Sequence, residues 1–420
     1  MCKPIVSRRN FLKQLGVGTC GSILHQSAFP NLSFGAYEQP RAAGVLGSSP
    51  ILIFVFLDGG CSYQIAPMYR SAYYDKNPTL GLTPETSLTL TAEQGLHPSL
   101  TYFQTLFTQQ NLALFNLVGY PNPNRSHEES RNIWFTAKRA SNGMGAGGWM
   151  ADLSCQINSL FAGISFGGAS RLTTGSCDGI RNFGDLSGFG EDRFKYSVSR
   201  SVELQDTRSL LFSDDTNPAT AARQLVNGSL VNIDKSVKLI QKETAKELPD
   251  VGIQFPNTSF GRACRDVARV INAGTSIGTQ AFFIRQGGFD THSQEAARMT
   301  SLLSDINASI APLVETIKAL GRWNNTAIIT GSEFCRTFEN GNEGTDHGHA
   351  GPMFVAGGMV KGGVKNSPPS NSVIQTANGF FNSHEVDFRQ IIHETVGAMG
   401  YDTTPIFEEQ FSYTGLRIFS

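Results

Sequence analysis

Five short runs of apolar residues, each followed at once by glycine, acidic or polar residues, dominate the pattern of the chain. Most residues in these runs are apolar at consecutive positions rather than at alternate ones, with exceptions such as Asn116 and Arg285, and this pattern is typical of strands buried on both faces of a sheet. We therefore expect a central sheet built from residues 51–57, 112–118, 281–286, 326–330 and 353–356.

A long helix is expected between the third and fourth runs. Apolar residues from Met299 to Leu320 recur at spacings of three and four, which places them on one side of a helix. Strand, helix and strand of these lengths form a βαβ unit with parallel strands. The predicted fold class is α/β, with a doubly wound, mixed but mostly parallel sheet flanked by helices. Such sheets bind ligands beyond the carboxyl ends of their strands.

Residues 45–420 are predicted to form one large domain with an insertion. The stretch from about 170 to 260 is rich in Gly, Ser and Asp and ends in a polar helical segment, so we interpret it as an inserted cap. The polar tract 365–378 is expected to be a surface loop. Residues 386–393 are expected to begin an amphipathic helix that closes the sheet.

Residues 1–36 have the pattern of a bacterial export signal. Arg8 and Arg9 precede a weakly apolar stretch of about ten residues, which is typical of a twin-arginine signal. This stretch is much shorter than the ~20 residues needed to cross a bilayer, so no integral membrane span is expected after processing. The predicted location is the periplasm, the cell surface or the outside of a bacterium, and the twin-arginine translocase is the expected partner during export.

Composition narrows the class of protein. The 34 basic and 35 acidic side chains give a net charge of −1, which provides no electrostatic footprint for nucleic acid or an anionic membrane. The 44 glycines and 29 phenylalanines, with only 16% charged residues, favour a buried sheet whose loops approach one another closely. The seven cysteines are odd in number and widely spaced, so they predict no disulfide framework, although they leave room for one long-range bridge.

The densest group of candidate metal ligands is Asp346, His347 and His349. Glycines around them let the backbone turn tightly enough to aim several side chains at one divalent cation. Carboxylates with imidazoles suit zinc, manganese or iron, and tolerate magnesium less readily. The alternative is a solvated loop with incidental histidines.

Further acids and a histidine follow other strands. Asp58 follows the first run, and Asp290 and His292 follow the third at positions i and i+2, where extended backbone points both side chains the same way. The alternative is that Asp290 caps a helix and His292 packs. Glu333 follows the fourth run, and its alternative is an acid in the first turn of a helix, favoured by the helix dipole.

Ser126 is the best nucleophile candidate, with His127 beside it as a second catalytic candidate. A serine at a strand-to-helix turn has its alkoxide stabilised by the helix amides and by an adjacent metal. The alternative is an N-cap serine with Glu129 completing a capping box. A Ser-His-Asp triad stays open, although no G-x-S-x-G elbow surrounds Ser126. Arg336 is expected either to hold an anionic substrate group or to be a plain surface arginine.

Together these motifs resemble a bacterial family called domain of unknown function 1501, and Thr345 to His349 is the most specific of them. That family is similar in architecture to the alkaline phosphatase and sulfatase superfamily, whose members place two divalent metals at the carboxyl end of a mixed sheet. Those enzymes hydrolyse phosphate or sulfate esters through a Ser, Thr or formylglycine nucleophile. The resemblance extends over Arg8-Arg9, Leu57 to Gly60, Arg125 to His127, Gly288 to His292, Ser332 to Thr337, Asn340 to Gly351 and Val386 to Arg389.

The resemblance implies Ser126 as the nucleophile and a shell of metal-binding residues comprising Asp58, Asp290, His292, Glu333, Asp346, His347 and His349. The chain also departs from the family pattern: Cys61 and Ala66 stand in the first loop where relatives carry other residues, and Phe334 stands where the phosphatases have a histidine ligand. These departures favour one metal site over two. Cys61 lacks the C-x-P-x-R context of a formylglycine precursor.

The predicted function is an exported metal-dependent hydrolase of phosphate or sulfate esters, acting on a small-molecule or polymer substrate. A divalent ion (zinc, manganese, calcium or magnesium) would activate Ser126 or a water. The alternative is a non-catalytic periplasmic or cell-surface binding or structural protein on the same scaffold, with the metal retained for folding.

Overall fold

The computed structural model describes residues 44–138, 147–175, 177, 179–186, 236, 238–407, 411 and 413–420. The predicted export signal and most of the predicted insertion lie outside these residues. The chain divides into two units, of which one comprises residues 1–39 and 187–243 and the other residues 40–186 and 244–420. The second unit contains the sheet and the candidate site. Among the described residues, no helix has the length and apolarity needed to span a membrane.

The second unit is built on a nine-stranded sheet in the order β12-β4-β11-β8-β1-β7-β5-β6, with β13 also paired to β4. Neighbouring strands are parallel except at β11, which runs antiparallel to both β4 and β8. The mixed, mostly parallel sheet is therefore confirmed. The strands are β1 (Ile51–Asp58), β4 (Leu112–Gly119), β5 (Gly163–Ser165), β6 (Ile180–Asn182), β7 (Ala281–Gly287), β8 (Thr326–Gly331), β11 (Gly351–Ala356), β12 (Gly363–Val364) and β13 (Val386–Asp387).

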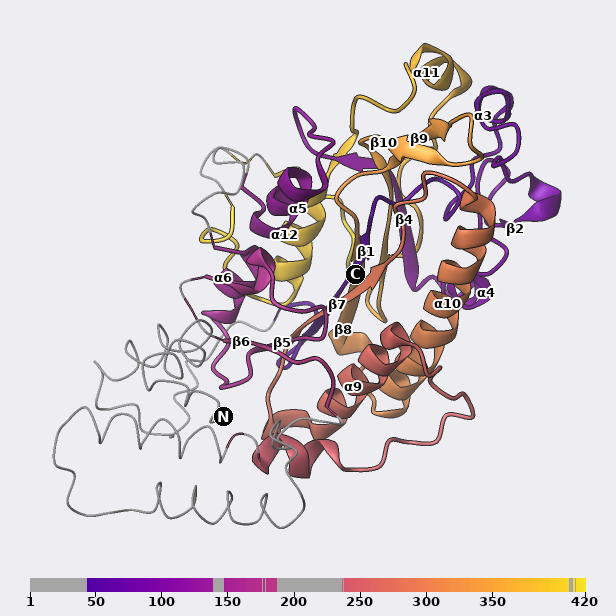
Figure 1. The fold of residues 1–420 in the computed structure, drawn as a ribbon. Coiled ribbons are helices and arrows are strands. Elements are labelled where there is room, and N and C mark those ends of the chain that lie inside the picture. Colours follow the sequence, from indigo (N-terminus) through magenta and orange to yellow (C-terminus); the bar gives the residue numbers. More distant parts are fainter. Residues whose placement is uncertain are drawn as a thin grey trace, which may run out of the picture. The chain divides into compact units, whose positions relative to one another are not determined.

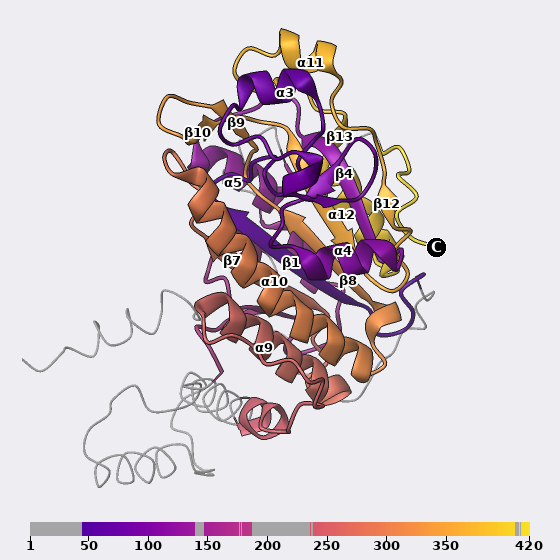
Figure 2. The ribbon, with the colours of Figure 1, turned by 90° about the vertical axis from the view of Figure 1, so that its right-hand side faces the viewer.

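Helices cover both faces of this sheet (Figures 1 and 2). One face carries α4 (Thr101–Thr108), α9 (Ser259–Ala273) and α10 (Glu295–Ala319), and the other carries α5 (His127–Thr136), α6 (Trp149–Ser154) and α12 (Phe388–Ala398). This double cover explains why the five runs are apolar at consecutive positions. The expected βαβ unit is β7, α10 and β8, with β1 lying between its two parallel strands.

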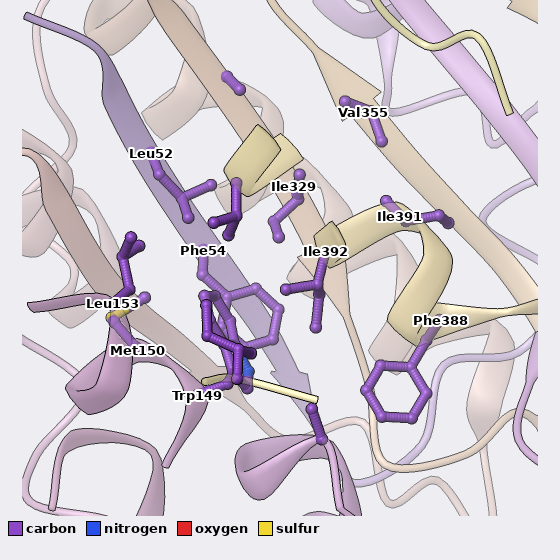
Figure 3. Packing of buried hydrophobic residues seen from close by; sticks show 14 of the residues in the cluster. Leu52, Phe54, Trp149, Met150, Leu153, Ile329, Val355, Phe388, Ile391 and Ile392 are labelled. Carbon is purple, nitrogen blue, oxygen red and sulfur yellow. The ribbon is translucent and has the colours of Figure 1, made fainter. Parts of the chain in front are cut away.

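Aromatic side chains make much of the core between the sheet and the second group of helices (Figure 3). Phe54 on β1 packs against Trp149 on α6, with ring centroids 5.5 Å apart. Phe388 on α12 stacks on Trp134 at 4.0 Å. Such pairs add about 0.5–1.5 kcal/mol each beyond the burial of their area, so the excess of phenylalanine in the composition serves to fill this layer.

Two segments differ from the sequence-based expectation. The tract 365–378 contains a short helix, α11 (Asn371–Thr376), because Ser370 caps it by accepting a hydrogen bond from the Val373 amide. Strand β6 lies within the predicted insertion but pairs with β5, so residues up to 182 belong to the sheet rather than to a cap.

The cysteines form one bridge among the described residues, Cys155–Cys177, which closes a loop of 22 positions. Cys61, Cys264 and Cys335 are free and buried. The sequence allowed one long-range disulfide bond. The structure has one bond among the described residues, but its two cysteines are only 22 positions apart.

His97 makes stability sensitive to acid. It is 3% exposed, its Nδ1 accepts a hydrogen bond from the Ser99 amide, and burial lowers its pKa to about 4. Since the unfolded chain takes up this proton near pH 6.5, the stabilisation is complete above that pH and is lost as the pH falls towards 4. We expect roughly 2 kcal/mol of unfolding free energy to be lost between pH 7 and 4.5 through this residue.

Urea unfolding of the wild type and of His97→Gln at both pH values measures this loss. The variant should show the smaller decrease on acidification. Equal decreases in the two proteins would show that His97 is not the group responsible.

Candidate metal centre

The candidate ligands follow the carboxyl ends of the central parallel strands. Asp58 ends β1, Asp290 and His292 lie between β7 and α10, Glu333 follows β8, and His127 begins α5 after β4. Two short strands beyond β8, β9 (Arg336–Glu339) and β10 (Thr345–His347), pair with each other and bring His347 to the same end of the sheet. Figures 1 and 2 show α5, β9 and β10 gathered there.

Three imidazoles converge on one carboxylate oxygen. The Nε2 atoms of His292, His347 and His127 lie 3.0, 3.3 and 3.5 Å from Oδ1 of Asp290. His127, Asp290 and His347 each offer a ligand atom within 4.8 Å of the others, as donors to one metal ion require. The loop after β7, strand β10 and helix α5 therefore meet at Asp290.

The other ring nitrogen of each histidine is held by an acceptor. Nδ1 lies 2.7 Å from Oε1 of Glu333 in His127, 2.7 Å from Oδ1 of Asp346 in His292, and 2.9 Å from the Arg125 carbonyl in His347. A carboxylate or carbonyl accepts only, so these contacts favour a proton on Nδ1, and a neutral ring in that tautomer has its lone pair on Nε2. This arrangement is typical of metal-binding histidines with outer acceptors.

The convergence is electrostatically unfavourable unless a cation or protons lie within it. In neutral rings of this tautomer, three Nε2 lone pairs face one carboxylate oxygen at 3.0–3.5 Å and repel it, and the Arg336 guanidinium on the same oxygen offsets only part of this repulsion. Nε2 of His127 is also buried without a hydrogen-bond partner in the described part of the chain. A buried polar atom without a partner costs about 1–3 kcal/mol, so the residues present fit a divalent cation.

Burial and neighbouring charges shift the pKa values of His127, Asp290 and His347, the three residues of the candidate metal cluster. The hydrogen bond to the Glu333 carboxylate raises the pKa of His127. Burial lowers the pKa of His347. Partial burial acts to raise the pKa of Asp290, but the hydrogen bond and charge of Arg336 outweigh it, so that pKa is lowered. Asp290 is therefore an anion at neutral pH, as a metal ligand must be.

Glu333 is a support for the cluster. Its side chain is fully buried, and its two oxygens accept hydrogen bonds from the Gly59 amide at 3.0 and 3.2 Å as well as from His127. No helix begins at this residue, so the expected role as a first-turn acid does not apply. Gly59 has φ +122°, and a Cβ there would lie 2.3 Å from the Asp290 amide nitrogen, so only glycine fits this contact.

Arg336 differs from both roles expected for it. Its side chain is fully buried, so it is not a surface arginine. It donates to Oδ1 of Asp290 at 2.5 Å, to the Gly59 carbonyl at 2.9 Å, and to both the hydroxyl and the carbonyl of Thr345. Because these donors are used within the protein, Arg336 balances the charge of Asp290 and does not extend towards a substrate.

The Asp346-His347-Gly348-His349 segment is split between three environments. His347 joins the cluster, whereas Asp346 lies outside it and holds His292. His349 is buried, accepts a hydrogen bond from the Tyr120 amide at Nε2, and places Nδ1 3.2 Å from the Asn382 carbonyl. Burial lowers the pKa of His349 to about 4. Both of its nitrogens are used, so the structure does not bring it to the metal-ligand group.

Asp58 also lies outside the convergence on Asp290. Its Oδ1 is 3.1 Å from Nη2 of Arg131, and its Oδ2 contacts Arg285. Arg131 stands one turn after His127 on α5, and its Nη2 is also 3.6 Å from Oε1 of Glu333. The first-strand aspartate is therefore neutralised by two arginines in this structure.

Ser126 is the N-cap residue of α5, but its side chain makes no capping hydrogen bond. Glu129 contacts the Asn124 side chain, so the capping box that the sequence suggested is absent. The serine is exposed and directly precedes His127.

His127 itself was expected to be catalytic and not to be a ligand. The sequence signal that could have identified it is its place at the strand-to-helix connection, eight positions after the end of β4.

Comparisons with known proteins give one family match. A family model described as "Protein of unknown function (DUF1501)" matches residues 157–407. No curated protein sequence matches the chain.

Several solved structures are similar to the chain at low identity. "Ps i-CgsB in complex with k-i-k-neocarrahexaose" has a TM-score of 0.40 at 10% identity, over 86% of this chain and 74% of that one. Alkaline phosphatase from the Antarctic bacterium TAB5 has a TM-score of 0.36 at 13% identity, over 86% and 100%. The C-terminal periplasmic domain of EcEptC from Escherichia coli, in complex with Zn, has a TM-score of 0.38 at 10% identity, over 89% and 92%. At these TM-scores the likeness supports no inference about activity or ligands.

Proposed function

The chain belongs to the DUF1501 family of proteins of unknown function, so its activity has to be inferred from its own site, and we propose that it is an exported metal-dependent hydrolase of phosphate or sulfate esters. One observation carries the proposal: three imidazole Nε2 atoms converge on Asp290 Oδ1, while each Nδ1 is held by an outer acceptor. A donor set of imidazoles and a carboxylate suits zinc, manganese or iron better than calcium or magnesium.

His127, Asp290 and His347 would hold one divalent ion, and His292, whose Nε2 lies 3.0 Å from Oδ1 of Asp290, would flank it. When bound, the ion supplies a Lewis acid that lowers the pKa of a nearby hydroxyl and stabilises developing negative charge. Glu333 keeps the proton on Nδ1 of His127, and Arg336 keeps Asp290 ionised. These contacts hold the ligand atoms in the required tautomer and charge state before a substrate arrives.

Partly exposed positive charge beside the cluster favours an anionic substrate. Arg125 is exposed and places its guanidinium 3.5 Å from the His347 carbonyl and 5.0 Å from the ring centroid of Phe380, whereas Arg131 and Arg285 are paired with Asp58. Guanidinium groups at the rim of a site attract phosphate or sulfate groups and hydrogen-bond to their oxygens. We assign the esters of these acids, small or polymeric, as the substrate class.

Ser126 is the proposed nucleophile, with water as the alternative. It stands at the amino end of α5, where helix amides stabilise an alkoxide, and it adjoins a proposed ligand. The proposal also includes export by the twin-arginine translocase to the periplasm or cell surface, which rests on the pattern of residues 1–36.

The rival function is a non-catalytic binding or structural protein that uses its metal for folding. The observation in its favour is the Phe334 ring, which lies 5.0 Å from the His127 ring and 4.8 Å from the His347 ring. This apolar ring occupies space beside the cluster where a second ion of a two-metal hydrolase would need polar ligands.

Hydrolysis assays separate these functions. We expect the zinc- or manganese-loaded protein to hydrolyse p-nitrophenyl phosphate or p-nitrophenyl sulfate, and a chelator to abolish this activity. Ser126→Ala should lower kcat by at least about tenfold with little change in KM, because the serine would act only in the transition state. Ser301→Ala, at an exposed position on α10, is the matched control.

An unchanged kcat in Ser126→Ala would assign the attack to water. No turnover of either ester by protein with one bound metal per chain would contradict the hydrolase proposal. Melting that depends on the metal would then support the structural alternative.

A further inference from the structure

Two buried cysteines that the proposed chemistry does not use face each other behind the candidate site. Cys61 follows β1 and Cys335 follows β8, and the two residues form an isolated parallel bridge in which the Cys61 amide donates to the Phe334 carbonyl at 3.1 Å. Paired residues of parallel strands point their side chains to the same side. Neighbouring strands lie about 4.8 Å apart, which falls within the roughly 4.4–6.8 Å between Cα atoms that a disulfide spans.

The two side chains also share a small cavity. Each is 3% exposed, and together with Trp134 and Met353 they line a space of about 20 Å³. Among the described residues, the candidate metal group contains no cysteine, so metal binding does not account for the pair.

We propose that Cys61 and Cys335 form a second disulfide bond when the chain folds under oxidising conditions. The chain already contains Cys155–Cys177, a kind of bond that persists only where thiols are not kept reduced. The inference is independent of the proposed hydrolase activity.

The bond would reinforce the support of the candidate site. The Gly59 amide donates to Glu333 and the Gly59 carbonyl accepts from Arg336, so two hydrogen bonds already join the segments that carry Cys61 and Cys335. A covalent link two residues from each of Gly59 and Glu333 would limit separation of these segments. The carboxylate that orients His127 would then keep its position.

The reaction balances with a low-molecular-weight disulfide such as oxidised glutathione. One cysteine thiolate attacks the glutathione S–S bond and releases a glutathione thiolate; the second cysteine thiolate attacks the resulting mixed disulfide and releases the other. The two protein thiols lose two protons and two electrons, and glutathione disulfide gains the electrons. Burial raises the pKa of both thiols in the folded chain, so oxidation is expected during folding and not afterwards.

Peptide mapping of the full chain tests the proposal. The protein is unfolded in reductant, refolded in a buffer of reduced and oxidised glutathione, alkylated in denaturant and digested with trypsin without reduction. We expect peptides 42–70 and 323–336 to be joined, with a mass two hydrogens below their sum, and to separate on reduction.

The same digest contains both controls. Peptides 140–171 and 172–181 should be joined through Cys155 and Cys177, and peptide 263–265 should carry an alkylated Cys264. In Cys335→Ala, Cys61 should be alkylated.

Recovery of both Cys61 and Cys335 as alkylated thiols, in protein whose Cys155–Cys177 bond has formed, would overturn the proposal. A bond from either residue to any other cysteine would also overturn it.

Discussion

Asp290→Ala is expected to abolish detectable binding of zinc or manganese and, with it, any metal-dependent hydrolysis. Oδ1 of Asp290 is the point on which three imidazole nitrogens converge. Its removal deletes the only anionic group among the proposed ligands and leaves the buried Arg336 cation without its partner at 2.5 Å. Loss of an outer acceptor lowers metal affinity about 10–100-fold, so we expect loss of a ligand that carries the charge to exceed about 100-fold.

Titration calorimetry of the metal-free protein with zinc measures this effect, and the metal content after dialysis gives a second readout. Asp75→Ala, at an exposed position on α3 (Ser71–Lys76), is the matched control and should bind like the wild type. Asp346→Ala should fall between the two, because Asp346 only orients His292. Zinc affinity within about threefold of the wild type in Asp290→Ala would contradict the assignment of this cluster as the metal centre.

Glu333→Ala is expected to lower the free energy of unfolding by about 3–5 kcal/mol, the usual effect of removing one member of a buried charged pair. The variant would leave the Gly59 amide, Nδ1 of His127 and the Arg131 guanidinium without the acceptor they share. The same change should weaken zinc binding about 10–100-fold, because His127 loses the group that fixes its tautomer.

Urea unfolding of the metal-free protein isolates the first of these effects, since a bound metal would add its own stabilisation. Glu128→Ala, at an exposed position in the first turn of α5, is the control and should change stability by less than about 0.5 kcal/mol. Glu333→Gln preserves the volume and one acceptor oxygen, so it should be less destabilising than alanine. A wild-type midpoint and slope in Glu333→Ala would show that the carboxylate does not support the fold.

Much of the fold followed from the sequence because burial on both faces leaves a direct signature. The run 51–57 is apolar throughout and the run 112–118 is interrupted only by Asn116, and in the structure every residue of both runs is buried. The strand ends were equally visible, since Asp58, Asp290 and Glu333 interrupt apolar segments. The antiparallel direction of β11 was not visible, because a short apolar run has the same appearance in either direction.

The sequence by itself indicated the five longer strands of the sheet and the reactive side chains that follow several of them, and so it proposed Asp290, His292 and His347 as candidates. Tertiary structure decided which of the candidates point at one place. His347 and His349 are two residues apart, yet one ring meets Asp290 while the other is held by Tyr120 and Asn382.

The physical reason is that a metal ligand needs a free nitrogen, and a remote partner decides which nitrogen is free. Nδ1 of His127 is held by Glu333, 206 positions away, and Nδ1 of His347 by the Arg125 carbonyl, 222 positions away. Local sequence contains no record of contacts at such separations. The sequence therefore located the end of the sheet where the site lies, and only packing between distant segments assigned each histidine its role.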